Sequence, residues 1–416
     1  MNVNETDNFY IAESSRCLHC AKPACAEACP LNNDVPRFLQ LVRDGKTDEA
    51  VQVVGHPFGG VCGFVCPHDA CCHGNCVLNK RGQAVKMGEV EKAVFQLNPY
   101  KVERKVRKGS KSYGLKVAVV GGGVSGITCA VKLYEQGVDV TVFERDELLS
   151  TLKLIPDFRL PREAIDSVLK EIDGKFTVVK KDVNFEDIFV RKHYDWQTKT
   201  QKNKIGESLQ LIDSYDAVYV ATGASVIYTL GVPGENLATP YDEFLKRTNH
   251  SGSVVVIGGG NTAMDCARVA KRAGCKVTVA YRRTRADMPA FNKEIEDAER
   301  EGVEFQYNLS PVKLERANGK LLLTLAKTVS EGRGKLTVTN DVTVVECDEV
   351  VAAIGSKFDN ENIYGAFIES LLKDNNPRNP RSRLYVGGDA LGASTVANAV
   401  ADGLKAARAI IKQYTK

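Results

Sequence analysis

A strand, a glycine-rich loop, a helix and a second strand follow one another twice in this chain of 416 residues. The first copy starts with the apolar run 116–120, continues through the loop GGGVSG at 121–126, and ends its second strand with Glu144. This loop fits G-x-G-x-x-G, whose glycines let the backbone approach a pyrophosphate at a helix N-terminus. A carboxylate at the end of the second strand accepts hydrogen bonds from ribose hydroxyls and repels a 2′-phosphate. The first copy therefore predicts an FAD-type or NAD-type site that includes Gly121, Gly123, Ser125, Gly126 and Glu144.

The second copy differs at the end of its second strand. Its loop, GGGNTA at 258–263, again joins a strand to a helix, and alanine is allowed at the third glycine position. Arg282 stands 24 positions after Gly258 and is followed by Arg283. Two guanidinium groups at this place suit a 2′-phosphate, which they can bind bidentately. We therefore expect a site for NADPH rather than NADH, formed by Gly258, Gly259, Gly260, Asn261, Thr262, Arg282 and Arg283.

Three further apolar segments end in small residues, at 217–223, 350–355 and 384–389, and the last precedes a helix from about residue 395. A small residue at a strand end lets the backbone come close to a cofactor. We expect contacts to the first cofactor from Thr222, Gly223, Gly388, Asp389, Thr395 and Val396, and to the second from Gly355. These segments argue against two unrelated nucleotide domains. A chain with both sites would pass hydride from a nicotinamide to a flavin.

Nine of the 13 cysteines lie before residue 77, in two groups. The first reads Cys17-x2-Cys20-x4-Cys25-x3-Cys29 before a proline, and the second reads Cys62-x3-Cys66-x5-Cys72-x3-Cys76. Disulfide frameworks are typical of short secreted chains, and structural zinc prefers two C-x2–4-C knuckles. A run that ends in Cys-Pro is typical of bacterial-type ferredoxins. The pattern therefore predicts iron–sulfur clusters, with zinc as the alternative, and spacing alone would include Cys62.

Composition and charge narrow the class of protein. The stretch 35–54 has apolar residues at helical spacing, which indicates a small all-helical domain over 1–100. Residues 101–115 form a basic linker, either a solvated connector or a docking strip for an acidic electron-transfer partner. No run of 18 apolar residues occurs, the polar start lacks the features of a signal peptide, and the net charge is only +4. We expect a cytoplasmic protein with no membrane insertion and no nucleic-acid partner.

The motifs together resemble a known family. The stretches that carry the resemblance are RCLHCAKPACAEACP, VCGFVCPHDACCHGNC, VAVVGGGVSGITCA, IPDFRLP, YDAVYVATGA, VVVIGGGNTAMDCARVAKRAG, AYRRTRADMPA and LYVGGDALGASTVANAVADG. The chain is similar over nearly its whole length to the NADPH-dependent small subunit of glutamate synthase. It is also similar to the N-terminal half of dihydropyrimidine dehydrogenase and to a subunit of the ferredoxin–NADP transhydrogenases.

The resemblance implies a multidomain chain, with an all-α iron–sulfur domain followed by two α/β Rossmann-like domains. The FAD domain would comprise 116–230 and 345–416, and the NADP domain, 231–344, would be inserted in it. Arg159, in IPDFRLP, would contact FAD. Two [4Fe-4S] clusters would be held by ligands that cross between the cysteine groups. One would have Cys17, Cys20, Cys25 and Cys76, and the other Cys29, Cys66, Cys72 and Glu91.

One departure from the family concerns the flavin loop, where Leu148, Leu149 and Leu154 stand at positions that are usually glycine. Because leucine would crowd the flavin, FAD binding is expected to be altered or weakened.

The main hypothesis is an electron-input subunit that transfers hydride from NADPH to FAD and passes single electrons through the clusters to a larger catalytic subunit or a ferredoxin-type acceptor. No catalytic side chain is expected, because hydride transfer needs positioning rather than a protein acid or base. This subunit would be like the small subunit of glutamate synthase, with the NAD(P)H-oxidising subunit of a dihydropyrimidine dehydrogenase or a ferredoxin–NADP transhydrogenase as the alternative. The alternatives are a cluster-bearing scaffold with a degenerate flavin site, and a self-contained NADPH:acceptor reductase.

Overall fold

The computed structural model describes residues 3–97, 108–109, 113–188, 192–195, 200–203, 211–224, 226–330, 336–358, 383–392 and 395–414. Most of the basic linker predicted at 101–115 lies outside these residues. The chain forms two compact units, one of Met1–Lys153, Asp157–Ala224 and Phe358–Lys416, the other of Leu154–Pro156 and Ser225–Lys357. The first unit is therefore interrupted in sequence by the second.

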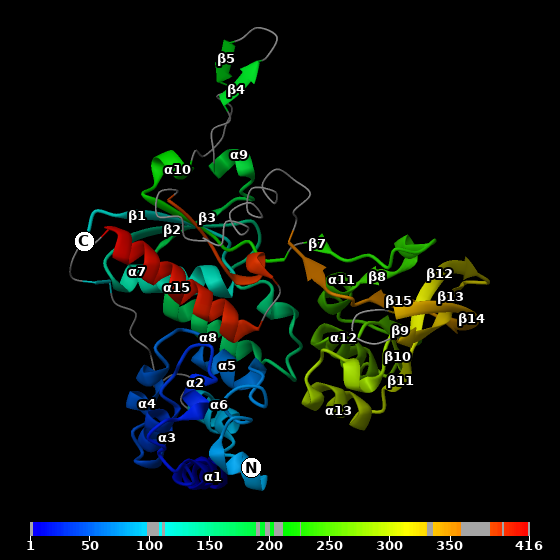
Figure 1. Ribbon diagram of the computed structural model, residues 1–416, viewed down its shortest axis with the longest axis horizontal. Coiled ribbons are helices and arrows are strands. Elements are labelled where there is room, and N and C mark those ends of the chain that lie inside the picture. Colours follow the sequence, from blue (N-terminus) through cyan, green and yellow to red (C-terminus); the bar gives the residue numbers. More distant parts are fainter. Residues whose placement is uncertain are drawn as a thin grey trace. The chain divides into compact units, whose positions relative to one another are not determined.

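The described residues from 3 to 97 form only helices (Figure 1). These are α1 (Val3–Ser15), α2 (Ala24–Glu27), α3 (Val35–Arg43), α4 (Thr47–Val54), α5 (Gly59–Val65), the 3-10 helix η1 (Val77–Arg81) and α6 (Met87–Leu97). The predicted helical period at 35–54 is confirmed, but a turn with Gly45 at φ 71° divides it into α3 and α4. Their apolar faces share one core with residues of α6, including Phe38, Val42, Val51 and Val94.

The first unit also contains a five-stranded parallel sheet of order β17-β6-β1-β2-β3. Its strands are β1 (Lys116–Val120), β2 (Asp139–Glu144), β3 (Thr177–Lys180), β6 (Ala217–Val220) and β17 (Leu384–Val386). Helices α7 (Val124–Glu135) and α15 (Val396–Tyr414) run side by side (Figure 1). The remaining elements are η2 (Leu152–Leu154), α8 (Arg162–Ile172), α9 (Phe185–Ile188), the antiparallel pair β4 (Lys192–Asp195) and β5 (Thr200–Asn203), α10 (Leu211–Ser214) and η5 (Gly388–Leu391).

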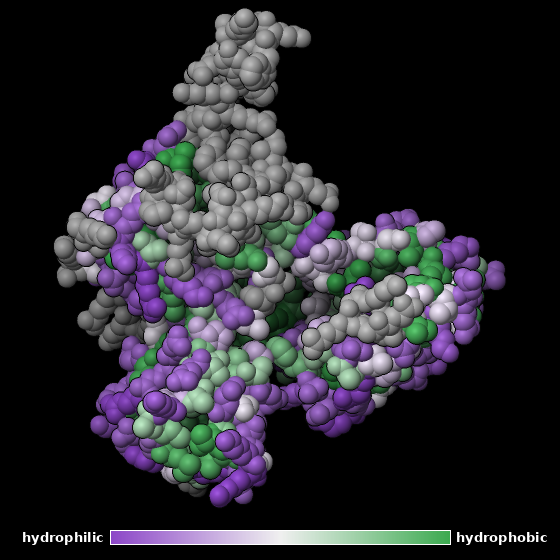
Figure 2. Space-filling model, in the orientation of Figure 1, coloured by the Kyte–Doolittle hydropathy of each residue, from purple (hydrophilic) through white to green (hydrophobic). Residues whose placement is uncertain are grey.

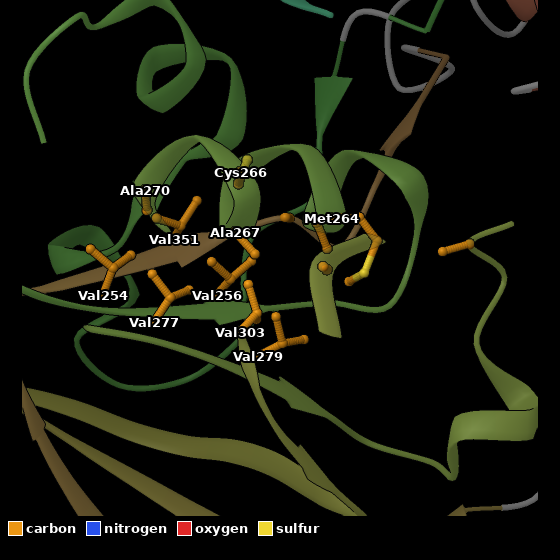
Figure 3. Packing of buried hydrophobic residues seen from close by; sticks show 14 of the residues in the cluster. Val254, Val256, Met264, Cys266, Ala267, Ala270, Val277, Val279, Val303 and Val351 are labelled. Atoms are coloured by element: carbon orange, nitrogen blue, oxygen red, sulfur yellow. The ribbon is translucent and has the colours of Figure 1, made fainter. Parts of the chain in front are cut away.

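The second unit has its own five-stranded parallel sheet of order β11-β10-β9-β15-β8. Its strands are β8 (Thr239–Pro240), β9 (Ser253–Ile257), β10 (Lys276–Tyr281), β11 (Glu304–Tyr307) and β15 (Glu349–Ala352). Its helices are η3 (Glu235–Leu237), α11 (Tyr241–Lys246), α12 (Asn261–Arg272), η4 (Arg285–Asp287) and α13 (Asn292–Arg300). Figure 3 shows valines of β9, β10 and β15 directed toward Met264, Ala267 and Ala270 of α12.

An antiparallel sheet of β12 (Leu309–Ala317), β13 (Lys320–Ser330) and β14 (Leu336–Cys347) completes this unit, with the short pair β7 (Val226–Ile227) and β16 (Ser356–Lys357). Green residues reach the surface at the antiparallel sheet (Figure 2), where Val329, Val338, Val342 and Val344 are exposed.

The second unit is longer at both ends than the NADP domain expected at 231–344. Strand β15 lies between β9 and β8, although residues 345–416 were expected in the FAD domain. The apolar run at 350–353 indicates a buried strand but carries no signal for which sheet it joins. The four cysteines outside the N-terminal region, Cys129, Cys266, Cys275 and Cys347, are buried in these cores. Over the described part of the chain, no helix has both the length and the apolar character needed to cross a membrane.

Candidate cofactor sites

The first glycine loop lies at the edge of the sheet where the parallel strands end. Gly121 has φ 108°, and a Cβ there would overlap the carbonyl oxygen of Ala221. A Cβ on Gly126 would overlap the carbonyl oxygen of Gly121, because α7 packs tightly against the loop. A Cβ on Gly123 would meet no atom within 4 Å. The open side of the loop is therefore at Gly123, the N-cap of α7, where a pyrophosphate would be expected.

Glu144 and Ser125 both lie beside this loop, in different ways. The Glu144 carboxylate accepts hydrogen bonds from the amides of Gly122, at 2.5 Å, and Asp146, at 2.8 Å. The Ser125 hydroxyl is buried and lies 2.7 Å from the Tyr219 hydroxyl. Ser125 therefore turns its side chain toward the core, and only its backbone can face a phosphate.

The ends of β6 and β17 reach the same edge of the sheet. Gly223 follows β6 with φ 73°, and the neighbouring Thr222 hydroxyl is buried without a hydrogen-bond partner in the described residues. A Cβ on Gly388 would lie 2.8 Å from the Ser125 Cβ, so this segment contacts the start of α7. Asp389 follows within η5.

Of the remaining residues predicted to contact FAD, Thr395 and Val396 lie at the start of α15, and Arg159 lies before α8. The Thr395 hydroxyl accepts a hydrogen bond from the Asn398 amide at 3.2 Å, next to Val396, the first residue of α15. Arg159 is half-buried between η2 and α8. The open loop and the unsatisfied Thr222 hydroxyl fit a bound cofactor that supplies phosphates and hydrogen-bonding groups at this edge.

The leucines of the flavin loop crowd Gly122 but not Gly123. The Leu148 side chain would meet a Cβ on Gly122 at 2.5 Å, whereas Gly123 stays open. Leu149 is fully buried, has φ 59°, and donates its amide to the Gly122 carbonyl at 3.0 Å. Leu154 is half-buried at the end of η2. The leucines therefore leave the phosphate-facing side of the loop accessible.

The second glycine loop has the same construction. Gly258 has φ 146°, and a Cβ there would overlap the carbonyl oxygen of Ala353, while Gly260 is open. The Asn261 side chain accepts a hydrogen bond from the Phe291 amide at 2.9 Å and so anchors the following loop. Thr262 is in the first turn of α12. Gly355 has φ 98° and follows β15, which pairs with β9 beside this loop.

Arg282 and Arg283 follow β10 at this edge of the sheet. Their carbonyl oxygens accept hydrogen bonds from the Thr328 hydroxyl, at 2.8 Å, and the Asn308 amide, at 3.1 Å. Among the described residues, no carboxylate forms an ion pair with either guanidinium. Arg285 differs, because it forms a two-bonded pair with Glu299 at 2.8 and 3.0 Å. Two guanidinium groups without an ion pair among the described residues are thus available for a 2′-phosphate, although Arg283 also acts on the Asp287 carboxylate.

Cysteines from both groups of the sequence gather around one cavity. It is lined by Cys17, Cys20, Cys25, Cys72 and Cys76 together with apolar residues. Burial, together with the nearby Cys17 and Cys76 thiols, raises the pKa of Cys25 to about 11. Burial and the nearby Cys20 and Cys76 likewise raise the pKa of Cys17. Because five cysteines line one cavity among apolar residues, their sulfurs form a donor set that fits an iron–sulfur cluster.

A second set of cysteine and acidic side chains lies where α5 approaches α6. Burial raises the pKa of Cys66 and Cys72, and the Glu91 carboxylate adds to both effects. Cys29 also raises the pKa of Cys72, so it reaches this group from the first segment. Glu91 is only 6% exposed, with its Oε2 3.9 Å from His68 Nε2. No three histidine, cysteine or acidic side chains in the described residues converge as tightly as one metal ion requires.

The structure gathers Cys17, Cys20, Cys25 and Cys76 around one cavity, which Cys72 also lines, and it brings Cys29, Cys66 and Cys72 near one another. The assignment of each ligand to one of two clusters stays a prediction. Cys62 and Cys71 also lie at the second set, because both affect the pKa of Cys66. Cysteine spacing alone did not separate Cys29 from its three neighbours in sequence.

Comparisons with known families agree with these sites. Residues 115–403 match the pyridine nucleotide-disulphide oxidoreductases. Residues 2–101 match the 4Fe-4S cluster domain II of dihydropyrimidine dehydrogenase. The chain is thus an NAD(P)H-dependent FAD oxidoreductase with a 4Fe-4S domain.

Individual relatives show which members of this large family the chain is similar to. The chain is 30% identical to a glutamate synthase [NADPH] small chain of Azospirillum brasilense, across 96% of this chain and 88% of the relative. The corresponding Escherichia coli protein is 29% identical, with coverage of 96% and 90%. A Lactococcus lactis thioredoxin reductase structure shares the fold, with a TM-score of 0.52 at 18% identity over 72% of this chain and 99% of that one. The chain therefore belongs to the glutamate synthase [NADPH] small chain family of pyridine nucleotide-disulphide oxidoreductases.

Proposed function

We propose that this chain is the electron-input subunit of a larger enzyme, in which it oxidises NADPH and delivers single electrons to a partner subunit. The observation that carries the proposal is the opposite chemistry of two otherwise equivalent loops. The first has Glu144 beside it and the second has Arg282 and Arg283, and the same chain gathers two sets of cysteines, most of them half-buried.

The residues divide the work between three kinds of site. Gly121, Gly123 and Gly126 would hold FAD, with Glu144 on its ribose, and Thr222, Gly223, Gly388, Asp389, Thr395 and Val396 around the rest. Gly258, Gly260 and the two arginines would hold NADPH. FAD supplies the conversion from two-electron hydride chemistry to single electrons, and the clusters supply one-electron carriers.

The cysteine sets favour two [4Fe-4S] clusters with crossed ligands. Cys17, Cys20, Cys25 and Cys76 would hold one, and Cys29, Cys66, Cys72 and Glu91 the other. The low exposure of Glu91 supports its role, since a buried carboxylate is costly without a strong partner and His68 Nε2 lies 3.9 Å away.

The partner is inferred from the relatives. Two of them are named small chains, and this chain covers 88% and 90% of their lengths. We therefore expect a larger glutamate synthase-like subunit as the electron acceptor. The scaffold alternative is disfavoured because Leu148 lies over Gly122 and leaves Gly123 open.

The direct test is an anaerobic titration of the purified full-length chain with NADPH. The flavin absorbance band should bleach, and reduced cluster signals should appear by electron paramagnetic resonance. A colourless, iron-free preparation made without air would contradict the proposal. Co-purification with a larger subunit would separate an electron-input subunit from a self-contained reductase.

The double variant R282A/R283A tests the choice of nucleotide. The KM for NADPH should rise at least about tenfold, because charge-assisted bonds to the 2′-phosphate are lost, while the KM for NADH should change little. R285A is the matched control, since Glu299 already holds that guanidinium, and it should preserve the preference for NADPH. Equal effects of the double variant on both nucleotides would refute the 2′-phosphate site.

A further inference from the structure

Tyr281 takes, in the second unit, the place that Glu144 takes in the first. Val120 pairs with Phe143 and Ile257 with Ala280, so the next residues, Glu144 and Tyr281, are equivalent. Each stands 23 positions after the first glycine of its loop (144 − 121 = 281 − 258 = 23). Arg282, 24 positions after Gly258, therefore follows the position equivalent to Glu144 and does not occupy it.

The two side chains treat their loops differently. The Glu144 carboxylate accepts the amide of Gly122, whereas the Tyr281 ring covers Gly259, where a Cβ would meet the ring at 2.5 Å. The second site therefore lacks, at this position, the carboxylate that accepts ribose hydroxyls in dinucleotide sites of the first kind. Binding of the 2′ end then depends on the two guanidinium groups that follow.

The Tyr281 hydroxyl connects the strand to the turn that carries those groups. It donates a hydrogen bond to the carbonyl oxygen of Asp287 at 2.8 Å. The Asp287 carboxylate in turn accepts the Thr284 amide and hydroxyl, at 3.2 and 2.5 Å. The turn of residues 284–287 is thus held both by the Tyr281 hydroxyl and by the bonds between Thr284 and Asp287.

The arginines lie close to this hydroxyl. Burial raises the pKa of Tyr281, and the guanidinium groups of Arg283 and Arg282 oppose that shift. The phenol therefore lies among the charges that would receive a phosphate. A side chain fixed at both ends in this way limits the conformations of its neighbours before the ligand arrives.

We propose that Tyr281 is a positioning residue for the 2′-phosphate of NADPH, which acts by holding the turn 284–287 and, through it, Arg282 and Arg283. The inference rests on the proposed function, namely that the second glycine loop binds NADPH. It adds a determinant of the preference for NADPH that carries no charge itself and also contacts the Arg283 guanidinium.

The test uses the full-length protein with its cofactors and two probes, adenosine 2′,5′-bisphosphate and 5′-AMP, in calorimetric titrations. Y281F should weaken the bisphosphate about three- to tenfold, the effect of one lost hydrogen bond, and leave 5′-AMP unchanged. A merely structural role would weaken both probes alike, because both share the adenosine and the 5′-phosphate. T284A should also weaken the bisphosphate selectively, since it removes the hydrogen bond of the Thr284 hydroxyl to Asp287 in the same turn. It replaces Y281F as the test variant if Y281F does not fold.

Y307F is the matched control. Tyr307 pairs with Tyr281 across the sheet, and its hydroxyl has no hydrogen-bond partner in the described residues, so both affinities should stay as in the wild type. Unchanged bisphosphate affinity in both Y281F and T284A, or equal losses for the two probes, would overturn the role of Tyr281 alone. If the wild type does not prefer the bisphosphate, or R282A/R283A retains that preference, the proposed NADPH site fails and the inference fails with it.

Discussion

Leu149 carries two opposing contributions to stability. Its side chain is fully buried, yet its φ of 59° places it in the left-handed region, which is unfavourable for a bulky residue. Removing a buried leucine side chain typically costs about 2–5 kcal/mol, whereas the left-handed backbone costs about 1–2 kcal/mol for a residue with a Cβ. Packing therefore outweighs backbone strain, which explains how the flavin loop can tolerate leucine where the family has glycine.

The two contributions can be separated by comparing L149A with L149G. Both variants should lower the free energy of unfolding by about 1–4 kcal/mol, because both lose the buried side chain. L149G should be at least as stable as L149A, because glycine adopts positive φ without cost, although glycine is usually the less stable of the two. Denaturant unfolding of the holoprotein measures the order, and a clearly less stable L149G would show that Leu149 is not held at positive φ.

The proposed role of Glu91 as a cluster ligand can be tested by the iron content of a variant. By the two-cluster hypothesis the anaerobically purified protein contains about eight irons, and E91A should retain closer to four. E89A is the matched control on the same helix, because Glu89 is largely exposed and pairs with Lys92 at 3.1 Å. Iron and acid-labile sulfide analysis gives the result. Full iron content in E91A would remove Glu91 from the ligand set and direct attention to Cys62.

At the scale of elements, different glycines of the loop between β1 and α7 are needed for folding and for binding. G126A should destabilise the first unit strongly, because its Cβ would overlap the carbonyl oxygen of Gly121. G123A should fold normally but bind FAD at least about tenfold more weakly, since Gly123 has an ordinary φ of −76° and faces the open side. Thermal unfolding and the flavin content of the purified variants check the pair. Normal flavin content in a stable G126A would contradict this account of the loop.

The elements also show what sequence could and could not predict. The two strand–loop–helix–strand copies could be predicted because their glycines follow a local pattern, in which Gly121, Gly126 and Gly258 each have a steric reason. The sheet that β15 joins was not, because an apolar run such as 350–353 fits the interior of either sheet. Ser125 was predicted to contact the cofactor from its place in the motif, but its hydroxyl pairs with Tyr219, 94 residues away in sequence. Long-range pairings of this kind leave no local signal.

At the scale of the whole molecule, the two units have separate hydrophobic cores. One core centres on β9, β10 and α12, and another on β1, β2 and α15. We expect two unfolding transitions, of which adenosine 2′,5′-bisphosphate should shift only the one that belongs to Ser225–Lys357. At about 100 times its Kd, a ligand stabilises its own unit by about 2.7 kcal/mol. Differential scanning calorimetry with and without the bisphosphate tests this, and a joint shift of one single transition would show that the units unfold together.

The order of segments along the chain has a consequence for how the protein is made. Strand β17 and helix α15 complete the first sheet, yet they follow the whole of Ser225–Lys357 in sequence. A ribosome therefore delivers every described strand of Ser225–Lys357 while the first sheet still lacks its β17 edge. Nascent chains stalled before residue 383 should already be retained on an immobilised 2′,5′-bisphosphate resin while holding no flavin, so the electron donor's site matures before the acceptor's.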